Sequence, residues 1–233
     1  MASFTLSGIG VTEIRNKLGD LVYTRNRGGQ TVRSFVVPTN TPSAHRTNAR
    51  NNFATAVSLW AALSSEEVIQ WNMFAQRFTK RNSIAQAYRP TGRNMFIECN
   101  VNLIAAGLFP ISAPVFNAMP AIVSAGRIVD LSSTDVVVSV SLVGNPPLLH
   151  TGNVLCVSAS PSVSAGINYP KNFFQPIQVF PAGTDLSSVD ITTDYVANYG
   201  NPVPGLKVFF KVWCVNVLSG VRCKPLIFSS VVG

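Results

Sequence analysis

Charged side chains are scarce in this chain of 233 residues. Asp, Glu, Lys and Arg make up 12% of it, about half of the ~25% that is usual in globular proteins. Apolar residues reach 47%, so a sizeable core is expected, and Ser, Thr and Asn must supply much of the polar surface. Because a weakly charged surface gives little repulsion between molecules, the composition favours a subunit covered by its neighbours. A monomer with a neutral polar surface is the alternative.

Long apolar runs and an export signal are also lacking. Runs such as residues 136–138 fall far short of the ~20 apolar residues that a membrane-spanning helix needs. The first residues contain neither the basic segment nor the apolar segment of a secretory signal. We therefore expect no membrane association, and a protein that is made in a cytoplasm and stays there or leaves inside a particle.

Groups that carry catalysis are few. The chain has two histidines, His45 and His150, and neither lies in a metal-binding or protease motif. Only ten residues are acidic, and Asp185, Asp190 and Asp194 lack the alternate-position spacing of a calcium loop. The sequence therefore predicts no catalytic, metal or cofactor-binding residues, no cofactor, and a protein that is not an enzyme.

The four cysteines have no Cys-x-x-Cys spacing and resemble small buried apolar residues in a reducing compartment. They are Cys99, Cys156, Cys214 and Cys223. The last two flank a predicted hairpin. A turn centred on Ser219 and Gly220 would not place them directly opposite each other, so a disulfide between them is not favoured.

Positive charge is concentrated in the first half. Residues 1–109 hold 12 basic and 5 acidic residues, a net charge of +7, whereas residues 110–233 have a net charge of +1. A basic half indicates an anionic partner, such as a nucleic-acid backbone or an acidic protein face. Arginines that donate hydrogen bonds to carbonyls in a packed assembly would explain the charge equally well.

A β-hairpin is predicted near the N-terminus. Residues 21–25 and 31–37 are rich in β-branched and aromatic side chains, and the two glycines between them supply the positive φ of a tight turn. Alternation along a strand would place Arg25 and Arg27 on one face, with Arg33 on the second strand. Because a two-stranded hairpin is barely stable alone, we interpret it as an arm that lies on another element or subunit.

Three helices are predicted after the hairpin. The first covers residues 43–63, with Phe53, Val57 and Trp60 at helical spacing. The second starts with a capping box of Ser64 and Glu67, and the third covers residues 92–107. Residues 80–90 between them are expected to be a basic linker.

The first of these helices has an unfavourable charge at its start. Arg46 and Arg50 lie there beside His45, although the helix dipole favours anions at that end. This mismatch indicates an external partner for the two arginines.

Composition changes at Pro110, which we take as the boundary between a domain of residues 1–109 and a domain of residues 110–233. Short β-rich runs separated by turn residues follow. They are residues 126–131, 135–143, 153–158, 176–180, 189–193, 206–218 and 221–232. Seven such runs predict a β-sandwich of the immunoglobulin or fibronectin-III type, with a barrel as the alternative. The fold class is therefore α+β, with a hairpin arm and a three-helix module followed by an all-β domain.

Several motifs of the first half resemble a family of small uncharacterised proteins from phages, prophages and Bacteroidota genomes. The matching stretches are residues 16–23 (NKLGDLVY), 25–33, 42–50 with Phe53, Trp60 and Trp71, and 92–96 (GRNMF). The chain departs from the family where Gln is frequent, since His45 and Asn48 occupy that stretch. The resemblance implies a phage particle component with an Ig-like C-terminal half, made in the host cytoplasm and located in the virion.

Together these features predict a bacteriophage virion structural protein of a capsid, head–tail connector or tail. It would contact other virion proteins or further copies of itself. The expected partner-binding residues are Arg25, Arg27, Arg33, Arg46 and Arg50.

Two other functions stay open. One is non-specific DNA binding in the packaged genome, although the second helix begins Ser-Ser-Glu-Glu, which suits a recognition helix poorly. The other is receptor or carbohydrate binding by aromatic side chains of the sandwich. Those aromatic residues are Tyr169, Phe173, Phe174, Tyr195 and Tyr199.

Overall fold

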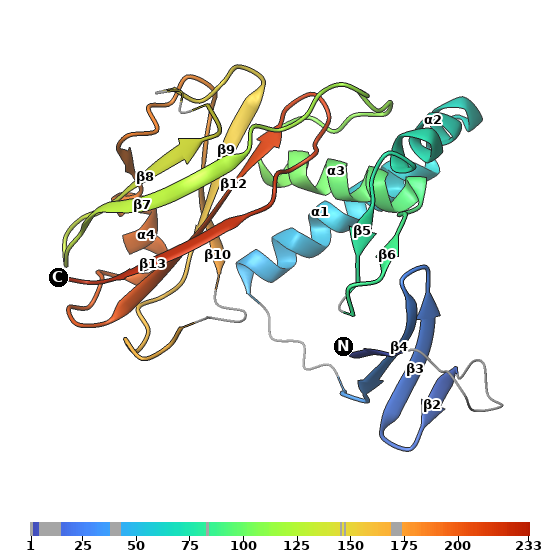
Figure 1. Ribbon diagram of the computed structural model, residues 1–233, viewed down its shortest axis with the longest axis horizontal. Helices are drawn as coiled ribbons and strands as arrows, with labels where there is room; N and C mark the ends of the chain where they lie inside the picture. Colours follow the sequence, from blue (N-terminus) through green and yellow to red (C-terminus); the bar gives the residue numbers. More distant parts are fainter. Residues whose placement is uncertain are drawn as a thin grey trace. The chain divides into compact units, whose positions relative to one another are not determined.

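The computed structural model describes residues 2–4, 15–37, 43–82, 84–144, 146, 148–168 and 174–233. Its helices and antiparallel sheets confirm the mixed α+β class (Figure 1). The chain divides into two compact units: unit 1 is Met1–Ile97 with Ser112–Pro114, and unit 2 is Glu98–Ile111 with Val115–Gly233. Helix α3 (Gly92–Ala105) contributes its first residues to unit 1 and the rest to unit 2. The domain boundary between residues 109 and 110 remains a prediction from composition.

Unit 1 begins with a four-stranded antiparallel sheet in the order β1-β4-β3-β2. Its strands are β1 (Ala2–Phe4), β2 (Asn16–Leu18), β3 (Leu21–Asn26) and β4 (Gly29–Ser34). The predicted hairpin is β3 and β4, and two further strands that were not predicted, β1 and β2, pair with it on either side. Of the two turn glycines, only Gly29 has a positive φ, at 106°.

The helices of unit 1 are α1 (Ala44–Ala61), α2 (Ser65–Ala75) and the start of α3. The capping box of Ser64 and Glu67 is present. Trp71 of α2 packs edge-to-face on Phe74 and Phe96, with ring centroids 5.5 and 5.2 Å apart. The predicted linker instead contains a short hairpin of β5 (Lys80–Arg81) and β6 (Ala87–Tyr88).

Unit 2 contains two antiparallel sheets, and each of the seven predicted strands is present. One sheet has the order β10-β9-β12-β13 and the other has the order β11-β8-β7. The strands are β7 (Val123–Leu131), β8 (Val136–Leu142), β9 (Asn153–Ala159), β10 (Gln175–Phe180), β11 (Val189–Asp190), β12 (Lys207–Asn216) and β13 (Leu226–Val231).

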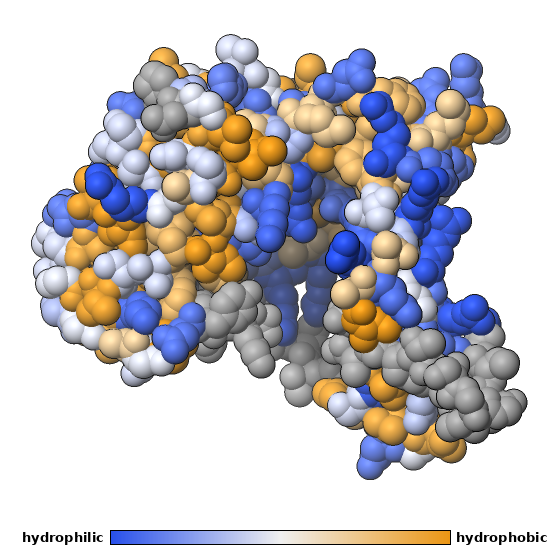
Figure 2. Space-filling view, viewed as in Figure 1, coloured by the Kyte–Doolittle hydropathy of each residue, from blue (hydrophilic) through white to orange (hydrophobic). Residues whose placement is uncertain are grey.

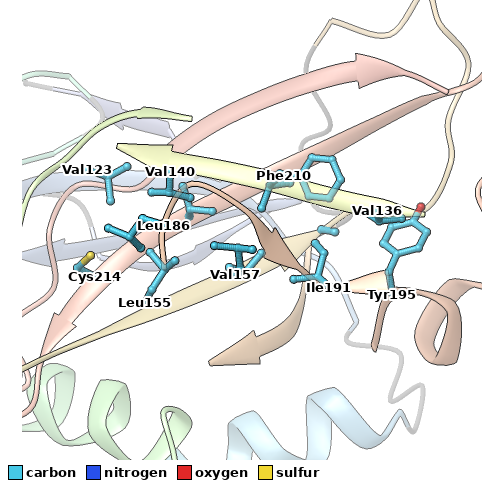
Figure 3. Close-up of a cluster of buried hydrophobic side chains, with 14 of the residues drawn as sticks. Val123, Val136, Val140, Leu155, Val157, Leu186, Ile191, Tyr195, Phe210 and Cys214 are labelled. Atoms are coloured by element: carbon cyan, nitrogen blue, oxygen red, sulfur yellow. The ribbon is translucent and has the colours of Figure 1, made fainter. Parts of the chain in front are cut away.

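Both sheets contribute to one apolar core (Figure 3). Val136 and Val140 of β8, Leu155 and Val157 of β9, and Phe210 of β12 are buried in it. Buried and half-buried residues alternate along the whole of β8, as expected for a strand with one face on a core. Two sheets around one core is the arrangement of a β-sandwich.

Helix α4 (Thr192–Tyr199) was missed by the sequence prediction, which continued a strand to residue 193. Tyr195 of this helix is fully buried in the core of unit 2. Its hydroxyl donates a hydrogen bond to the Ser160 carbonyl at 3.2 Å, and the Tyr199 hydroxyl donates to the Ala159 carbonyl at 2.8 Å. The helix therefore closes the core instead of extending the sheet.

Candidate interaction surface

The turn of the β3–β4 hairpin is tied to another part of unit 1. Nη1 of Arg27 donates to the carbonyls of Arg89 and Pro90, each at 3.4 Å. Nδ2 of Asn82 donates to the Gly28 carbonyl. Arg27 therefore stabilises the hairpin turn within its own unit, and the expectation that it shares a strand face with Arg25 was wrong, because Arg27 lies in the turn between the paired residues Asn26 and Gly29.

Asn82 organises this junction, and the sequence analysis did not single it out. Its Oδ1 accepts hydrogen bonds from the backbone N–H groups of Ile84 at 3.1 Å and Gln86 at 2.8 Å. These bonds close the β5–β6 turn while Nδ2 reaches Gly28. One side chain thus links two hairpins, as Asn often does through its compact pair of donor and acceptor.

The predicted arginines of the sheet do not share one face. Arg25 lies opposite Gln30, whereas Arg33 lies opposite Val22. Counting along β3, Val22 and Arg25 are three residues apart and point to opposite sides. Arg25 and Arg33 are both exposed, but they lie on opposite faces of the sheet.

The buried residues whose side chains are described in this sheet are polar. Gln30 and Thr31 are the buried residues of β2, β3 and β4. The hydroxyls of Thr31 and Thr24 lie 2.6 Å apart across the strands. The side-chain amide of Gln30 is buried, and within the described part of the chain neither its nitrogen nor its oxygen has a hydrogen-bond partner. Such orphaned groups are rare and costly in native structures.

Large apolar side chains of the same region are exposed instead. Leu18 and Leu21 lie on the sheet, and Phe35, Val36 and Val37 follow β4, with Val36 and Val37 about 70% exposed. We call these five residues the apolar strip. Nζ of Lys17 lies 3.9 Å from the ring centroid of Phe35. Figure 2 shows apolar atoms on the surface of this sheet, the module labelled β2 to β4 in Figure 1.

Helix α1 carries the remaining predicted residues. Its N-cap Ser43 accepts a hydrogen bond from the backbone N–H of Arg46, and its first turn has no acidic residue. Arg46 and Arg50 are exposed and four residues apart, so they lie on one helix face. Ala56 is the buried residue of this 18-residue helix, and Trp60 packs edge-to-face on Phe96 with ring centroids 5.3 Å apart. Phe53, expected in an apolar stripe, is largely exposed.

Within the described ranges, no three His, Cys, Asp or Glu residues are grouped so that they could hold a metal ion. His45 belongs to unit 1 and His150 to unit 2. Among the helices described, none has the length and apolar character needed to cross a membrane.

The three described aromatic residues of the predicted binding set, Phe174, Tyr195 and Tyr199, are not exposed. Tyr195 is buried and Tyr199 partly buried, contrary to the expectation that both are exposed. Phe174 is partly buried, with Nζ of Lys211 5.7 Å from its ring centroid. Tyr169 and Phe173 lie outside the described residues.

The register of the last hairpin corrects the prediction about its cysteines. Val215 pairs with Arg222, and the backbone N–H of Cys223 donates to the Cys214 carbonyl at 3.0 Å. Cys214 and Cys223 are therefore directly opposite each other. The turn is displaced because Oδ1 of Asn216 accepts the backbone N–H of Leu218 at 3.0 Å and of Ser219 at 3.2 Å.

No family model and no curated protein matches this sequence. Among solved structures, one match is a protein from a computer-based redesign of a β-sandwich protein. It shares 14% sequence identity, with a TM-score of 0.32, and the match covers 49% of this chain and 97% of the redesigned protein.

Proposed function

We propose that this chain is a bacteriophage virion structural protein that acts through subunit contacts in a capsid, head–tail connector or tail. It associates with copies of itself or with other virion proteins. The observation that carries the proposal is the N-terminal sheet, whose described buried positions are polar while the apolar strip is exposed. The family resemblance of the first half supports the phage assignment.

Covering the apolar strip stabilises an assembly. Complete burial of a Val, Leu or Phe side chain contributes about 1.5–3 kcal/mol. Phe35, Val36 and Val37 are roughly half to three-quarters exposed, so a partner that covers these three residues gains on the order of 4 kcal/mol before the entropic cost of association. A few such contacts, repeated in a symmetric particle, suffice to favour assembly.

The two units have different roles in this proposal. In unit 1 the helices form a compact three-helix module, the sheet is the contact arm, and Arg25, Arg33, Arg46 and Arg50 contact the neighbouring subunit. Unit 2 is an Ig-like or fibronectin-III-like sandwich. Its strand order supports this assignment, since the first, second and fifth strands form one sheet and the third, sixth and seventh lie together in the other. The fourth strand lies beside the third.

Deletion of residues 1–37 tests the proposal. The truncated protein should stay folded in unit 2 and lose its self-association, measured as molar mass by light scattering across a range of protein concentrations. The double substitution Val36→Asp and Val37→Asp should have the same effect with the chain intact. Val143→Asp is the matched control, because Val143 is also largely exposed, at 60%, but lies in a turn of unit 2. Normal assembly of the truncated protein would contradict the proposal.

The alternative is a DNA-binding protein of the packaged genome. The net charge of +7 in residues 1–109 and the exposed pair Arg46 and Arg50 favour it. The opposite orientation of Arg25 and Arg33 argues against a single DNA-binding face on the sheet. Fluorescence anisotropy with labelled duplex DNA distinguishes the two functions. DNA binding that falls steeply with salt, in a protein that is otherwise monomeric, would support the alternative.

A further inference from the structure

Two cysteines of unit 2 face each other across the hairpin that follows β12. The backbone N–H of Cys223 donates to the Cys214 carbonyl at 3.0 Å, and the neighbouring pair Val215 and Arg222 is in register. Directly opposite residues of an antiparallel pair have Cα atoms about 4.5–5.5 Å apart. Disulfide-linked cysteines have Cα atoms about 4.4–6.8 Å apart, so the backbone here is already spaced for a disulfide.

The side chains are also close. The backbone N–H of Cys214 donates a hydrogen bond to Sγ of Cys223 at 3.1 Å. Both residues are buried, and both belong to the main core of unit 2 (Figure 3 shows Cys214 at one end of it). Cys156, by contrast, packs with Leu103, Val154 and Val215 in a separate apolar cluster.

The two thiols differ in acidity. Hydrogen bonds from the thiol and the backbone N–H of Cys214 lower the pKa of Cys223 to about 6. Donation of its thiol hydrogen to Cys223 raises the pKa of Cys214, and burial raises it further. Burial raises the pKa of Cys156 to about 12. Since thiolates are the nucleophiles of disulfide exchange, Cys223 is the thiol that reacts first.

We propose that Cys214 and Cys223 are a redox pair that closes to a cross-strand disulfide in the presence of a small-molecule disulfide such as oxidised glutathione. The Cys223 thiolate attacks one sulfur of the oxidant, its S–S bond breaks, and one glutathione thiolate leaves. Cys214 then loses its proton and attacks the Cys223 sulfur of the mixed disulfide, which releases the second glutathione thiolate. Two protein thiols are oxidised, and one glutathione disulfide is reduced to two thiols.

The surroundings of Cys223 suit this order of events. Arg222 and Lys224 on either side of it are exposed, and these cations attract an anionic oxidant to the hairpin. Cys214 is completely buried, so it meets only the sulfur already bonded to its neighbour. The inference concerns unit 2 alone and does not depend on the proposed assembly function.

Peptide mass spectrometry of the full chain tests the pair. The protein is equilibrated in buffers of oxidised and reduced glutathione, remaining thiols are blocked with iodoacetamide, and the chain is digested with trypsin without reduction. Trypsin cleaves after Arg222 and therefore separates the two cysteines unless a disulfide joins residues 212–222 to residues 223–233. We expect the joined peptides in oxidising buffer and their disappearance after reduction. The melting temperature of unit 2 should rise by about 5–10 °C on oxidation.

The remaining cysteines give matched controls. Cys156→Ser and Cys99→Ser should leave the joined peptides unchanged, whereas Cys214→Ser should leave Cys223 as a stable mixed disulfide with glutathione. If Cys214 and Cys223 of the unaltered protein are both blocked by iodoacetamide after oxidation, the proposal is wrong. It is equally wrong if Cys223 is joined to Cys156.

Discussion

The N-terminal sheet of unit 1 and the sheets of unit 2 are both antiparallel, yet they are stabilised in different ways. Strand β8 places Val136, Val138 and Val140 on one side, and all three are buried in a core shared by two sheets. Strand β4 buries Gln30 and Thr31, while apolar side chains nearby are exposed. The comparison teaches that regular strand pairing does not by itself provide a core. Unit 2 contains its own apolar core, whereas the described side chains buried in the N-terminal sheet are polar.

The largest loss of stability is expected from a substitution in the core of unit 2. Phe210 is fully buried on β12 and stacks on Phe228 with ring centroids 5.7 Å apart. Phe210→Ala should lower the free energy of unfolding of unit 2 by about 3–5 kcal/mol, measured by urea unfolding. Phe35→Ala in unit 1 is the comparison, because Phe35 is half exposed. A similar loss for both variants would show that the two regions do not differ as described.

A substitution at the hairpin tip of unit 2 should lower the free energy of unfolding less than Phe210→Ala does. Gly220 has a φ of 66°, and a Cβ there would overlap the backbone carbonyl of Cys99. We expect Gly220→Ala to lower the free energy of unfolding by about 1–3 kcal/mol. Gly144→Ala separates the two causes, since Gly144 also has a positive φ of 88° but has open space around it. Equal losses in calorimetry would mean that the close approach to α3 contributes nothing.

Removal of the Asn82 side chain should loosen the N-terminal sheet without affecting unit 2. Asn82→Ala abolishes its hydrogen bonds to Gly28, Ile84 and Gln86 at a cost of about 1–2 kcal/mol. Amide hydrogen exchange should become faster in β3 and β4 and stay unchanged in β9 and β12. Unchanged exchange in β3 and β4 would indicate that the hairpin turn does not depend on Asn82.

The smallest change in stability is expected at the start of α2, and it depends on pH. Hydrogen bonds from the Ser64 backbone and hydroxyl lower the pKa of Glu67 below its ordinary value of 4.5. A carboxyl with a lowered pKa stabilises the folded state above its ordinary pKa, and this contribution is lost as the pH falls through the lowered value. Glu67→Gln should therefore reduce the melting temperature of unit 1 slightly at pH 7 and not at pH 3. An equal difference at both pH values would exclude a role for the charge.

Secondary structure was predicted best where a strand alternates between residues of its two faces or a helix begins with a capping box. The strands of unit 2 were predictable because runs such as residues 136–142 alternate, and α2 because Ser64 and Glu67 stand three residues apart. Helix α4 was not predictable, since Thr192, Tyr195 and Val196 favour strands. In the structure, Tyr195 of this helix is buried in the core of unit 2. The short strands β1 and β2 have no such pattern.

The role of the arginines in partner binding stays a prediction, but the structure shows where they lie. The exposure of Arg25, Arg33, Arg46 and Arg50 was expected, but the faces they occupy depend on register. Arg27 lies in the turn because Asn26 pairs with Gly29, and the position of a turn is hard to infer from two adjacent glycines. Similarly, hydrogen bonds to the Asn216 side chain shift the last turn from its expected position, so that Cys214 lies opposite Cys223. Register is set by single hydrogen bonds that composition does not reveal.

Hydrogen exchange as a function of protein concentration tests the central claim most directly. The claim is that the N-terminal sheet is completed by a partner while the sheets of unit 2 are complete in one chain. The amides of β3 and β4 should exchange rapidly in dilute protein and slow down as subunits associate, whereas those of β8 and β12 should exchange slowly at every concentration. Strong protection of β3 and β4 in a dilute monomer would contradict the account, because the sheet would then be stable without a partner.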